Sequence, residues 1–187
     1  MNFVPSIPIF GYLVVGCLPF IVFRRGRYNL RWLATAVPFF LSACALVTGV
    51  VGWTGSWFSV HPLILMTITA IAIIIIWATA LSHQQAPALW HQDNGTPSQL
   101  VTTGTYRFVR HPFYSSFLLL LVVAWLALPS FWTLVPLAYG TIALEITARS
   151  EERGLHSLFG ESYSRYVSRS GRFIPPLKAI VSRGDAT

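Results

Sequence analysis

Five long runs of apolar residues limit what this chain can fold into more than any other feature of its sequence. A helix needs about 20 apolar residues to cross the hydrocarbon core of a bilayer, with a usual range of roughly 17–25. Only 10% of the 187 residues are charged, against about 25% in an average soluble domain. The sequence therefore excludes a water-soluble globule and predicts membrane helices. The runs are Phe3–Phe23, Leu33–Trp53, Val60–Leu81, Pro112–Leu128 and Phe131–Ala148.

The last two runs are short, and only Leu128-Pro129-Ser130 separates them. Because short connections join neighbouring antiparallel helices, we expect these two runs to form a tight hairpin. The predicted fold is an all-α, multi-pass membrane bundle of five transmembrane helices with a further C-terminal helix on the cytoplasmic side. Residues 1–187 are expected to form a single integral-membrane domain. Residues 1–81 would hold three helices, and residues 82–187 a loop, the hairpin and the C-terminal helix.

Basic residues are distributed unevenly around these runs. The net charge is +7, and arginines follow the first run, precede the fourth and follow the fifth, whereas residues 54–59 and 129–130 carry no charge. With five crossings all these arginines lie on one side, which the positive-inside rule makes cytoplasmic. We expect the N-terminus outside and the C-terminus in the cytoplasm and, for a chain of this size, a bacterial inner membrane. Lipid headgroups are nearer partners for these arginines than nucleic acid. The sequence does not predict an oligomeric state.

Polar residues concentrate in two segments, 82–110 and 149–172. Proline is favoured at the first position of a helix, so Pro112 predicts a helix start with His111 at its cap. The N-terminus of a helix also favours anions. Tyr106, Arg110 and Tyr114 lie within nine residues of one another around this point, which favours a site over a lone headgroup contact.

Three charged residues further along, Glu145, Arg149 and Glu152, are spaced four and three apart and therefore share one face of a helix. A carboxylate near the membrane end of a helix is unfavourable unless it faces a partner or a wet cavity. An ion pair between Glu145 and Arg149 is the simple explanation for two of the three. Gly160 is the expected end of this helix.

Several other chemistries find no support in the sequence. No glycine-rich nucleotide-binding motif is present, and no metal site is predicted, because His83 and His91 are eight residues apart with Pro87 between them. Cys17 and Cys44 both lie inside apolar runs and do not form a disulfide framework.

The two polar segments together resemble the isoprenylcysteine carboxyl methyltransferase family, whose wider relatives include phospholipid N-methyltransferases. The resemblance covers roughly the C-terminal half. It rests on three elements: Leu100-Val101-Thr102-Thr103-Gly104-Thr105-Tyr106, Arg110-His111-Pro112-Phe113-Tyr114, and the paired Glu151-Glu152 followed by Leu155, Phe159-Gly160, Tyr163 and Tyr166.

This resemblance implies an integral-membrane methyltransferase that uses S-adenosylmethionine and acts on a lipophilic acceptor at the boundary between membrane and cytosol. Methylation of a carboxylate oxygen is the first expectation, with nitrogen or sulfur acceptors as alternatives. The candidate catalytic residues are Arg149, Glu152 and His111. The family pattern would place the cofactor against Gln99, Leu100, Val101, Tyr106, His111, Pro112, Tyr114 and Glu151.

Two positions depart from the family pattern. Ser98 stands where the eukaryotic pattern has a histidine, and Thr147 stands where it has a substrate-binding arginine, for which Arg149 is the nearest substitute. A similar C-terminal region occurs in sterol and steroid reductases, which would use NADPH. A non-catalytic carrier or scaffold is the third possibility.

Overall fold

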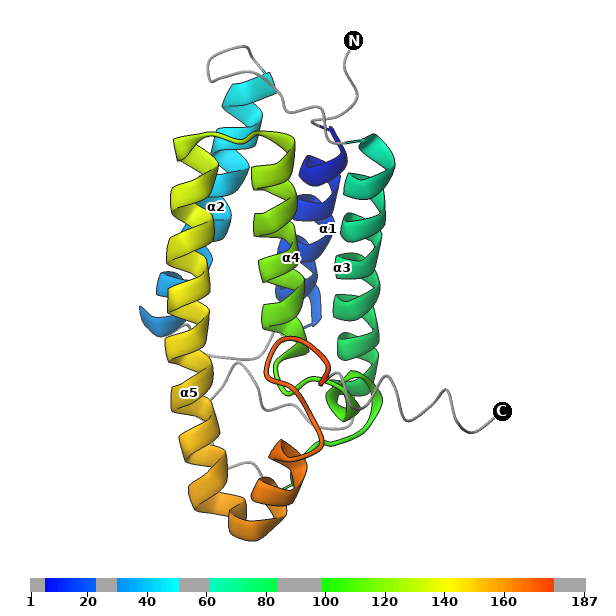
Figure 1. Ribbon diagram of the computed structural model, residues 1–187, viewed down its shortest axis with the longest axis vertical. Helices are drawn as coiled ribbons and strands as arrows, with labels where there is room; N and C mark the ends of the chain where they lie inside the picture. The colour runs from blue at the N-terminus through cyan, green and yellow to red at the C-terminus, as the bar shows by residue number, and fades with distance from the viewer. Residues whose placement is uncertain (1–5, 23–29, 51–60, 84–98, 177–187) are drawn as a thin grey trace, which may run out of the picture.

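The computed structural model describes residues 6–22, 30–50, 61–83 and 99–176, and these form a bundle of helices (Figure 1). Within these ranges the only β-type pairing is an isolated bridge between Val109 and Gly171, so the predicted all-α class is confirmed. Each of the five apolar runs overlaps one α-helix. The elements are α1 Ser6–Val22, α2 Leu30–Val50, α3 Pro62–His83, the 3-10 helix η1 Gly104–Arg107, α4 Pro112–Ala127 and α5 Phe131–Val167.

Successive α-helices run in opposite directions, so α1, α3 and α5 begin at one end of the bundle and α2 and α4 at the other (Figure 1). Helix α4 packs against α3 and α5, while α1 packs against α3 and α2 against α5. Buried apolar side chains such as Leu46, Ile76 and Leu120 fill the space between the helices. The predicted hairpin of α4 and α5 is confirmed, with residues 128–130 as its connection.

The outer surface of the bundle is also apolar. Phe10, Ile74 and Ile142 are 61%, 64% and 60% exposed. Large contiguous apolar surfaces are uncommon on soluble monomers, whereas hydrocarbon tails match them. This outer surface supports the membrane setting that the sequence predicts.

Two of the helices are long and apolar enough to cross a membrane on their own, Pro62–Ser82 and Phe131–Val167. The other apolar helical stretches among the described residues are shorter, at Ile7–Gly16, Ala36–Gly49 and Pro112–Ala127. The prediction of five transmembrane helices therefore stays a prediction. In α5 only the part up to Ala148 is apolar, which is about 27 Å of helix at 1.5 Å per residue, and the charged part follows without a break.

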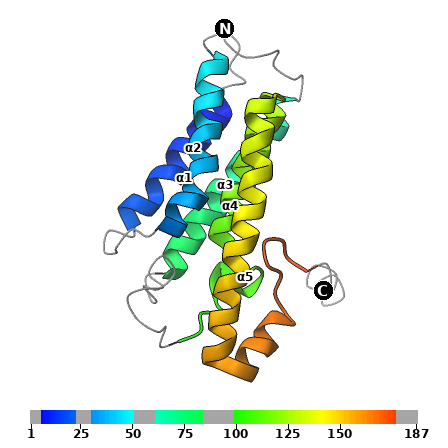
Figure 2. The same ribbon diagram turned by 90° about the vertical axis from the view of Figure 1, so that its left-hand side faces the viewer.

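The predicted C-terminal helix follows the apolar part of α5 without a break, since α5 runs for 37 residues to Val167. Gly160, the expected helix end, lies outside helical geometry, with φ 49° and ψ −120°, and divides α5 into two helical parts that meet at a kink. Figure 2 shows the turns after the kink folding back towards the bundle. The chain changes direction here because Gly160 alone lies outside helical geometry, and the residues after it resume helical hydrogen bonding.

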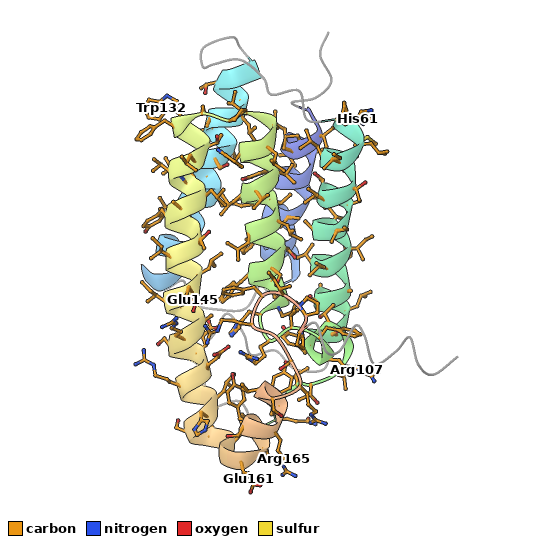
Figure 3. The ribbon with its side chains drawn as sticks, viewed as in Figure 1. His61, Arg107, Trp132, Glu145, Glu161 and Arg165 are labelled. Carbon is orange, nitrogen blue, oxygen red and sulfur yellow. The ribbon has the colours of Figure 1, made fainter. Side chains whose placement is uncertain are left out.

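Charged residues gather towards one end of the bundle. Among the described residues, every Asp, Glu, Lys and Arg is either Arg31, in the first turn of α2, or lies between Arg107 and Arg172. Figure 3 shows Arg107, Glu145 and Arg165 towards this end, with His61 and Trp132 at the other. This polar end contains the start of α4 and the charged part of α5, and it is where a site must be sought.

Candidate functional site

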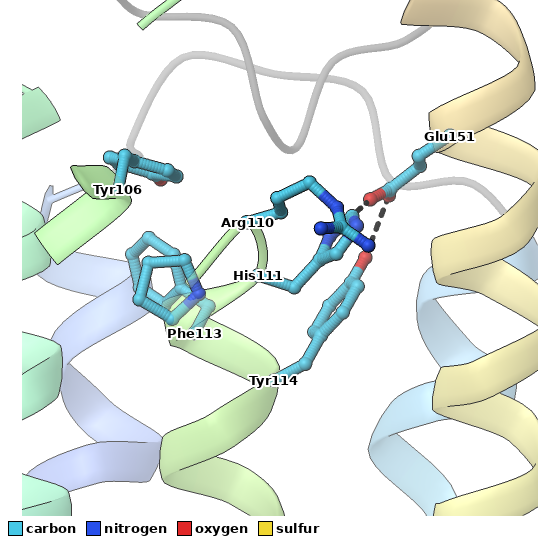
Figure 4. A pocket seen from close by; sticks show the side chains of 7 residues that line it. Tyr106, Arg110, His111, Phe113, Tyr114 and Glu151 are labelled. Atoms are coloured by element: carbon cyan, nitrogen blue, oxygen red, sulfur yellow. Dashed lines mark hydrogen bonds and ion pairs between the residues drawn. The ribbon is translucent and has the colours of Figure 1, made fainter. Parts of the chain in front are cut away.

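The site is built around His111, which stands at the start of α4. Pro112 occupies the first helical position, as predicted, and His111 is the cap residue, but its side chain does not cap the helix. Its ring instead points towards α5, as Figure 4 shows. Nδ1 lies 3.3 Å from Glu151 Oε2 and Nε2 lies 3.2 Å from Glu152 Oε1.

Both ring nitrogens of His111 therefore face carboxylates, and both can donate only when the imidazole is protonated. Burial by itself would lower the pKa of His111, but the hydrogen bonds to Glu151 and Glu152 outweigh it and raise the pKa above its ordinary value. The His111 ring links two adjacent glutamates of α5 to the start of α4.

Glu151 is buried and has hydrogen-bonding capacity left. Tyr114 Oη donates to its Oε1 at 2.7 Å, and the His111 ring is stacked on the Tyr114 ring at 5.3 Å with an interplanar angle of 5°. An ionised carboxylate offers about four acceptor sites. With Tyr114 and His111 as its two described partners, Glu151 can accept further hydrogen bonds from a ligand.

Glu152, by contrast, is saturated. Its Oε1 accepts from Arg110 Nε at 2.9 Å, Arg172 Nε at 3.0 Å and the His111 ring, and its Oε2 accepts from Arg172 Nη2 at 2.7 Å. Partial burial would raise the pKa of Glu152, but the hydrogen bonds from His111, Arg172 and Arg110 together lower it well below its usual range. Glu152 is a fixed anion that holds three cations in place.

Besides the start of α4 and the charged part of α5, the segment 168–173 also borders the site. This segment follows α5 and lies against the start of α4, and we call it the strap. Backbone hydrogen bonds join Arg110 N to Gly171 O at 2.8 Å and His111 N to Arg172 O at 3.1 Å. Ser115 Oγ donates to the carbonyl oxygen of Phe173 at 2.7 Å. The strap thus fixes both the backbone around His111 and the position of Arg172.

Arg172 is the site residue that the sequence reasoning missed. Besides its contacts with Glu152, it donates through Nη1 to Glu145. The predicted ion pair of Arg149 Nε with Glu145 Oε1 is confirmed at 2.7 Å. The stretch from Glu145 to Glu152 holds three glutamates and one arginine, Arg149, and that imbalance was the signal available in the sequence.

Tyr106, in η1, is buried, and its carbonyl oxygen accepts a hydrogen bond from Tyr166 Oη at 2.7 Å. This bond joins the segment before α4 to the part of α5 beyond the kink. The two polar segments of the sequence are therefore in direct contact.

A small cavity of about 20 Å³ lies beside His111 (Figure 4), close to the space that one water molecule needs. Five predicted cofactor residues line it together with Arg110 and Phe113, namely Tyr106, His111, Pro112, Tyr114 and Glu151. Gln99, Leu100 and Val101 are not among the residues that line this cavity.

A larger open groove of about 750 Å³ lies on the other side of the glutamate pair. The predicted catalytic residues Arg149 and Glu152 line it, whereas His111 does not. Ser98, His91 and Pro87 lie outside the described residues. The hydroxyl of Thr147 donates a hydrogen bond to the carbonyl oxygen of Ala143 at 2.8 Å. In the described part of the chain, no group of three or more His, Cys, Asp or Glu side chains is placed to hold a metal ion.

Comparison with known proteins gives one informative similarity. No family model matches the chain. Over 87 residues, 46% of this chain, it is 38% identical to Methanethiol S-methyltransferase 1 of Bradyrhizobium diazoefficiens. The aligned part of the chain spans 29% of that protein's length. The chain is thus similar, over just under half of its own length, to a methyltransferase.

Proposed function

We propose that the chain is a membrane methyltransferase that uses S-adenosylmethionine and transfers a methyl group to a lipophilic acceptor at the boundary between membrane and cytosol. The observation that carries the proposal is the bridge from Glu151 through His111 to Glu152, which joins the two polar segments at the charged end of an apolar bundle. The similarity to a methyltransferase supports methyl transfer over the NADPH-dependent alternative.

The side chains around the small cavity suit such a cofactor chemically. Glu151 can accept hydrogen bonds from an amino group or a ribose hydroxyl, and Tyr106 and Tyr114 offer aromatic surface. S-adenosylmethionine, when bound, supplies a methyl group on a positively charged sulfur. A carboxylate paired tightly with that sulfur would favour the ground state, so Glu151 belongs with the amino or ribose part. Ligand pockets usually have volumes of roughly 300–1,000 Å³, so binding must widen this cavity.

The state of the ionisable groups favours an acceptor that is already an anion. A general base needs a lone pair that is free to take a proton. Both nitrogens of His111 face carboxylates, and Glu152 already accepts from two arginines. Glu151 keeps acceptor capacity, but we assign it to the methyl donor. A carboxylate acceptor, as in the isoprenylcysteine carboxyl methyltransferases, or a thiolate needs no base. An amine acceptor would need one.

Binding of the methyl donor tests this proposal directly. In calorimetry on the detergent-solubilised protein, we expect S-adenosylmethionine to bind, and Glu151→Gln to weaken binding by about tenfold to a hundredfold, because a hydrogen bond to a charged group is worth about 1.5–3 kcal/mol. Glu161→Gln, an exposed site beyond the kink, is the control. No binding of S-adenosylmethionine by the folded wild-type protein would contradict the proposal.

Two further measurements separate the alternatives and identify the acceptor. A thermal-shift comparison of S-adenosylmethionine with NADPH distinguishes a methyltransferase from a reductase, and a carrier would respond to neither. Mass spectrometry of lipid extracts incubated with the protein and an isotopically labelled methyl donor would then reveal which lipophilic molecule gains the label. A labelled amine as the main product would contradict the anionic acceptor.

A further inference from the structure

The open groove of about 750 Å³ is separate from the small cavity beside His111. It is lined by Ile146, Arg149, Glu152, Arg153, His156, Tyr163, Val167 and Arg172. These residues come from α5 on both sides of the Gly160 kink and from the strap. Glu152 faces this groove, and its neighbour Glu151 lines the cavity, so the two spaces lie on either side of the glutamate pair.

The groove carries an excess of positive charge. Three arginines and one glutamate line it, and that glutamate, Glu152, is already bound by Arg110 and Arg172. Arg149 is paired with Glu145. Arg153 has no carboxylate within ion-pair distance among the described residues, and its Nε is 3.4 Å from the carbonyl oxygen of Arg149. Its guanidinium therefore has donors left for an anion.

A second, independent feature also points to a ligand. Tyr163 lines the groove and is only 2% exposed, and in the described part of the chain its hydroxyl has no hydrogen-bond partner. A buried hydroxyl without a partner is unfavourable by about 1–3 kcal/mol, and such groups are rare in native structures. An acceptor oxygen of a ligand that displaces the side chains covering this hydroxyl would satisfy it.

The position of the groove along the axis of α5 indicates which kind of anion it would bind. The apolar part of α5 ends at Ala148, and Arg149 and Arg153 follow within five residues, which is about 7.5 Å of helix. In a bilayer the headgroup region on each side is roughly 5–8 Å thick. Ile146 and Val167, which are 62% and 36% exposed, add apolar surface to the same groove. If α5 crosses the membrane, the arginines lie at the depth of lipid phosphates.

We propose that this groove is a binding site for an anionic phospholipid, whose phosphate is held by Arg153 and Tyr163 and whose acyl chain lies against Ile146. The proposal rests on the membrane setting of the proposed function but not on methyl transfer. Because adjacent residues line the two spaces, Glu152 the groove and Glu151 the cavity, a bound lipid would lie next to the proposed methyl-donor site.

Native mass spectrometry of the detergent-solubilised protein, without methyl donor, tests this site. We expect phosphatidylglycerol to be retained more tightly than phosphatidylcholine with the same acyl chains. Arg153→Gln should weaken phosphatidylglycerol binding about fivefold, since each basic residue near an anionic membrane surface contributes about 1 kcal/mol. Tyr163→Phe keeps the ring and should weaken binding about twofold to tenfold, the value of one hydrogen bond.

Arg169→Gln is the matched control, because Arg169, like Arg153, is exposed and donates to the carbonyl oxygen four residues earlier, at 3.2 Å, but it does not line the groove. It should bind phosphatidylglycerol as the wild type does. The proposal fails if the two lipids bind equally, if Arg153→Gln or Tyr163→Phe binds like the wild type, or if Arg169→Gln loses as much as Arg153→Gln. Equal affinity for free glycerol phosphate would show that the ligand is a soluble phosphate, and this too overturns the proposal.

Discussion

Glu151 and Glu152 are adjacent in sequence and chemically alike, yet they differ in how many hydrogen bonds they accept. Glu152 accepts four hydrogen bonds from cationic side chains and is fixed, whereas Glu151 keeps capacity for a ligand. The sequence showed that both acids belong to one site. Which of them is free depends on Arg172, which is 20 residues away along the chain and is positioned by the strap, and no local pattern predicts that contact.

At the residue scale, Arg172 is expected to be irreplaceable by lysine. Its guanidinium contacts Glu152 through two nitrogens and Glu145 through a third, and a lysine ammonium, as a single point, cannot reproduce that geometry. Arg172→Lys should therefore lower the free energy of unfolding by about 1.5–3 kcal/mol, measured by denaturant titration in detergent. Arg169→Lys, at an exposed arginine of the same helix end, should change it little, and an equal loss in both variants would contradict this role.

The pH dependence of stability follows from the same cluster. The folded-state pKa of His111 is raised, so its stabilising contribution is fully present below its unfolded value near 6.5 and is lost as the pH rises through the folded value. The folded-state pKa of Glu152 is lowered, so its contribution is present above about 4.5 and is lost as the pH falls through the folded value. The combined contribution of His111 and Glu152 to the free energy of unfolding should therefore be greatest between about pH 4.5 and 6.5.

Melting temperatures measured across pH 4 to 9 check this dependence. His111→Gln should remove the decline on the alkaline side, because glutamine does not titrate there. His156→Gln, at an exposed histidine in the same helix, is the control and should retain the decline. If the melting temperature of the wild type rises from pH 6 to 8, the prediction that His111 stabilises the fold in its protonated form is contradicted.

At the scale of the element, α5 shows what the sequence could and could not predict. The apolar run to Ala148 predicted its apolar helical part, and the spacing of Glu145 and Arg149 predicted their ion pair, because both depend on residues within one or two turns. The sequence also flagged Gly160. It could not show that the helix resumes after this glycine, because that depends on packing of Tyr163 and Tyr166 against residues far away in the chain.

Two glycines of α5 make a matched pair for testing the kink. Gly160 has φ +49°, a conformation that side chains other than glycine adopt with strain of about 1–3 kcal/mol, so Gly160→Ala should destabilise the protein by about that amount. Gly154 is helical, and nothing lies within 4 Å of the position of an added Cβ. Gly154→Ala should stabilise the helix by about 0.5–1 kcal/mol. Denaturant titration checks both values, and the same sign in the two variants would contradict a kink fixed by Gly160.

The strap depends on a close approach rather than on backbone strain. A Cβ added at Gly171 would collide with the carbonyl oxygen of Ile174, while the backbone of Gly171 pairs with Phe108 and Arg110. Glycine is therefore required where the strap crosses the start of α4. The sequence of the strap contains no helix or strand periodicity, which is why its contact with His111 emerges only in three dimensions.

At the scale of the whole molecule, charged residues lie at one end of an otherwise apolar bundle, as expected for a protein in a membrane. The alternating directions of five helices place every described Asp, Glu, Lys and Arg at one end, and this alternation is what the sequence-based orientation assumed. The site lies at that same end. A charged methyl donor and a lipophilic acceptor can meet only at such a boundary, so the orientation of the bundle decides from which compartment the donor would come.

Orientation is a testable prediction about the intact chain. In a variant with Cys17 and Cys44 replaced by alanine, Pro129→Cys places a thiol in the connection of α4 and α5, and Ser157→Cys places one on the exposed surface of the charged end. In intact bacterial cells expressing the protein, a membrane-impermeant maleimide should label the first thiol and should label the second only after the inner membrane is permeabilised, because the arginine-rich end is expected in the cytoplasm. The reverse pattern would place the site on the outer side, where cytosolic S-adenosylmethionine does not reach it. That result would contradict the proposed function, however well the site residues fit the donor.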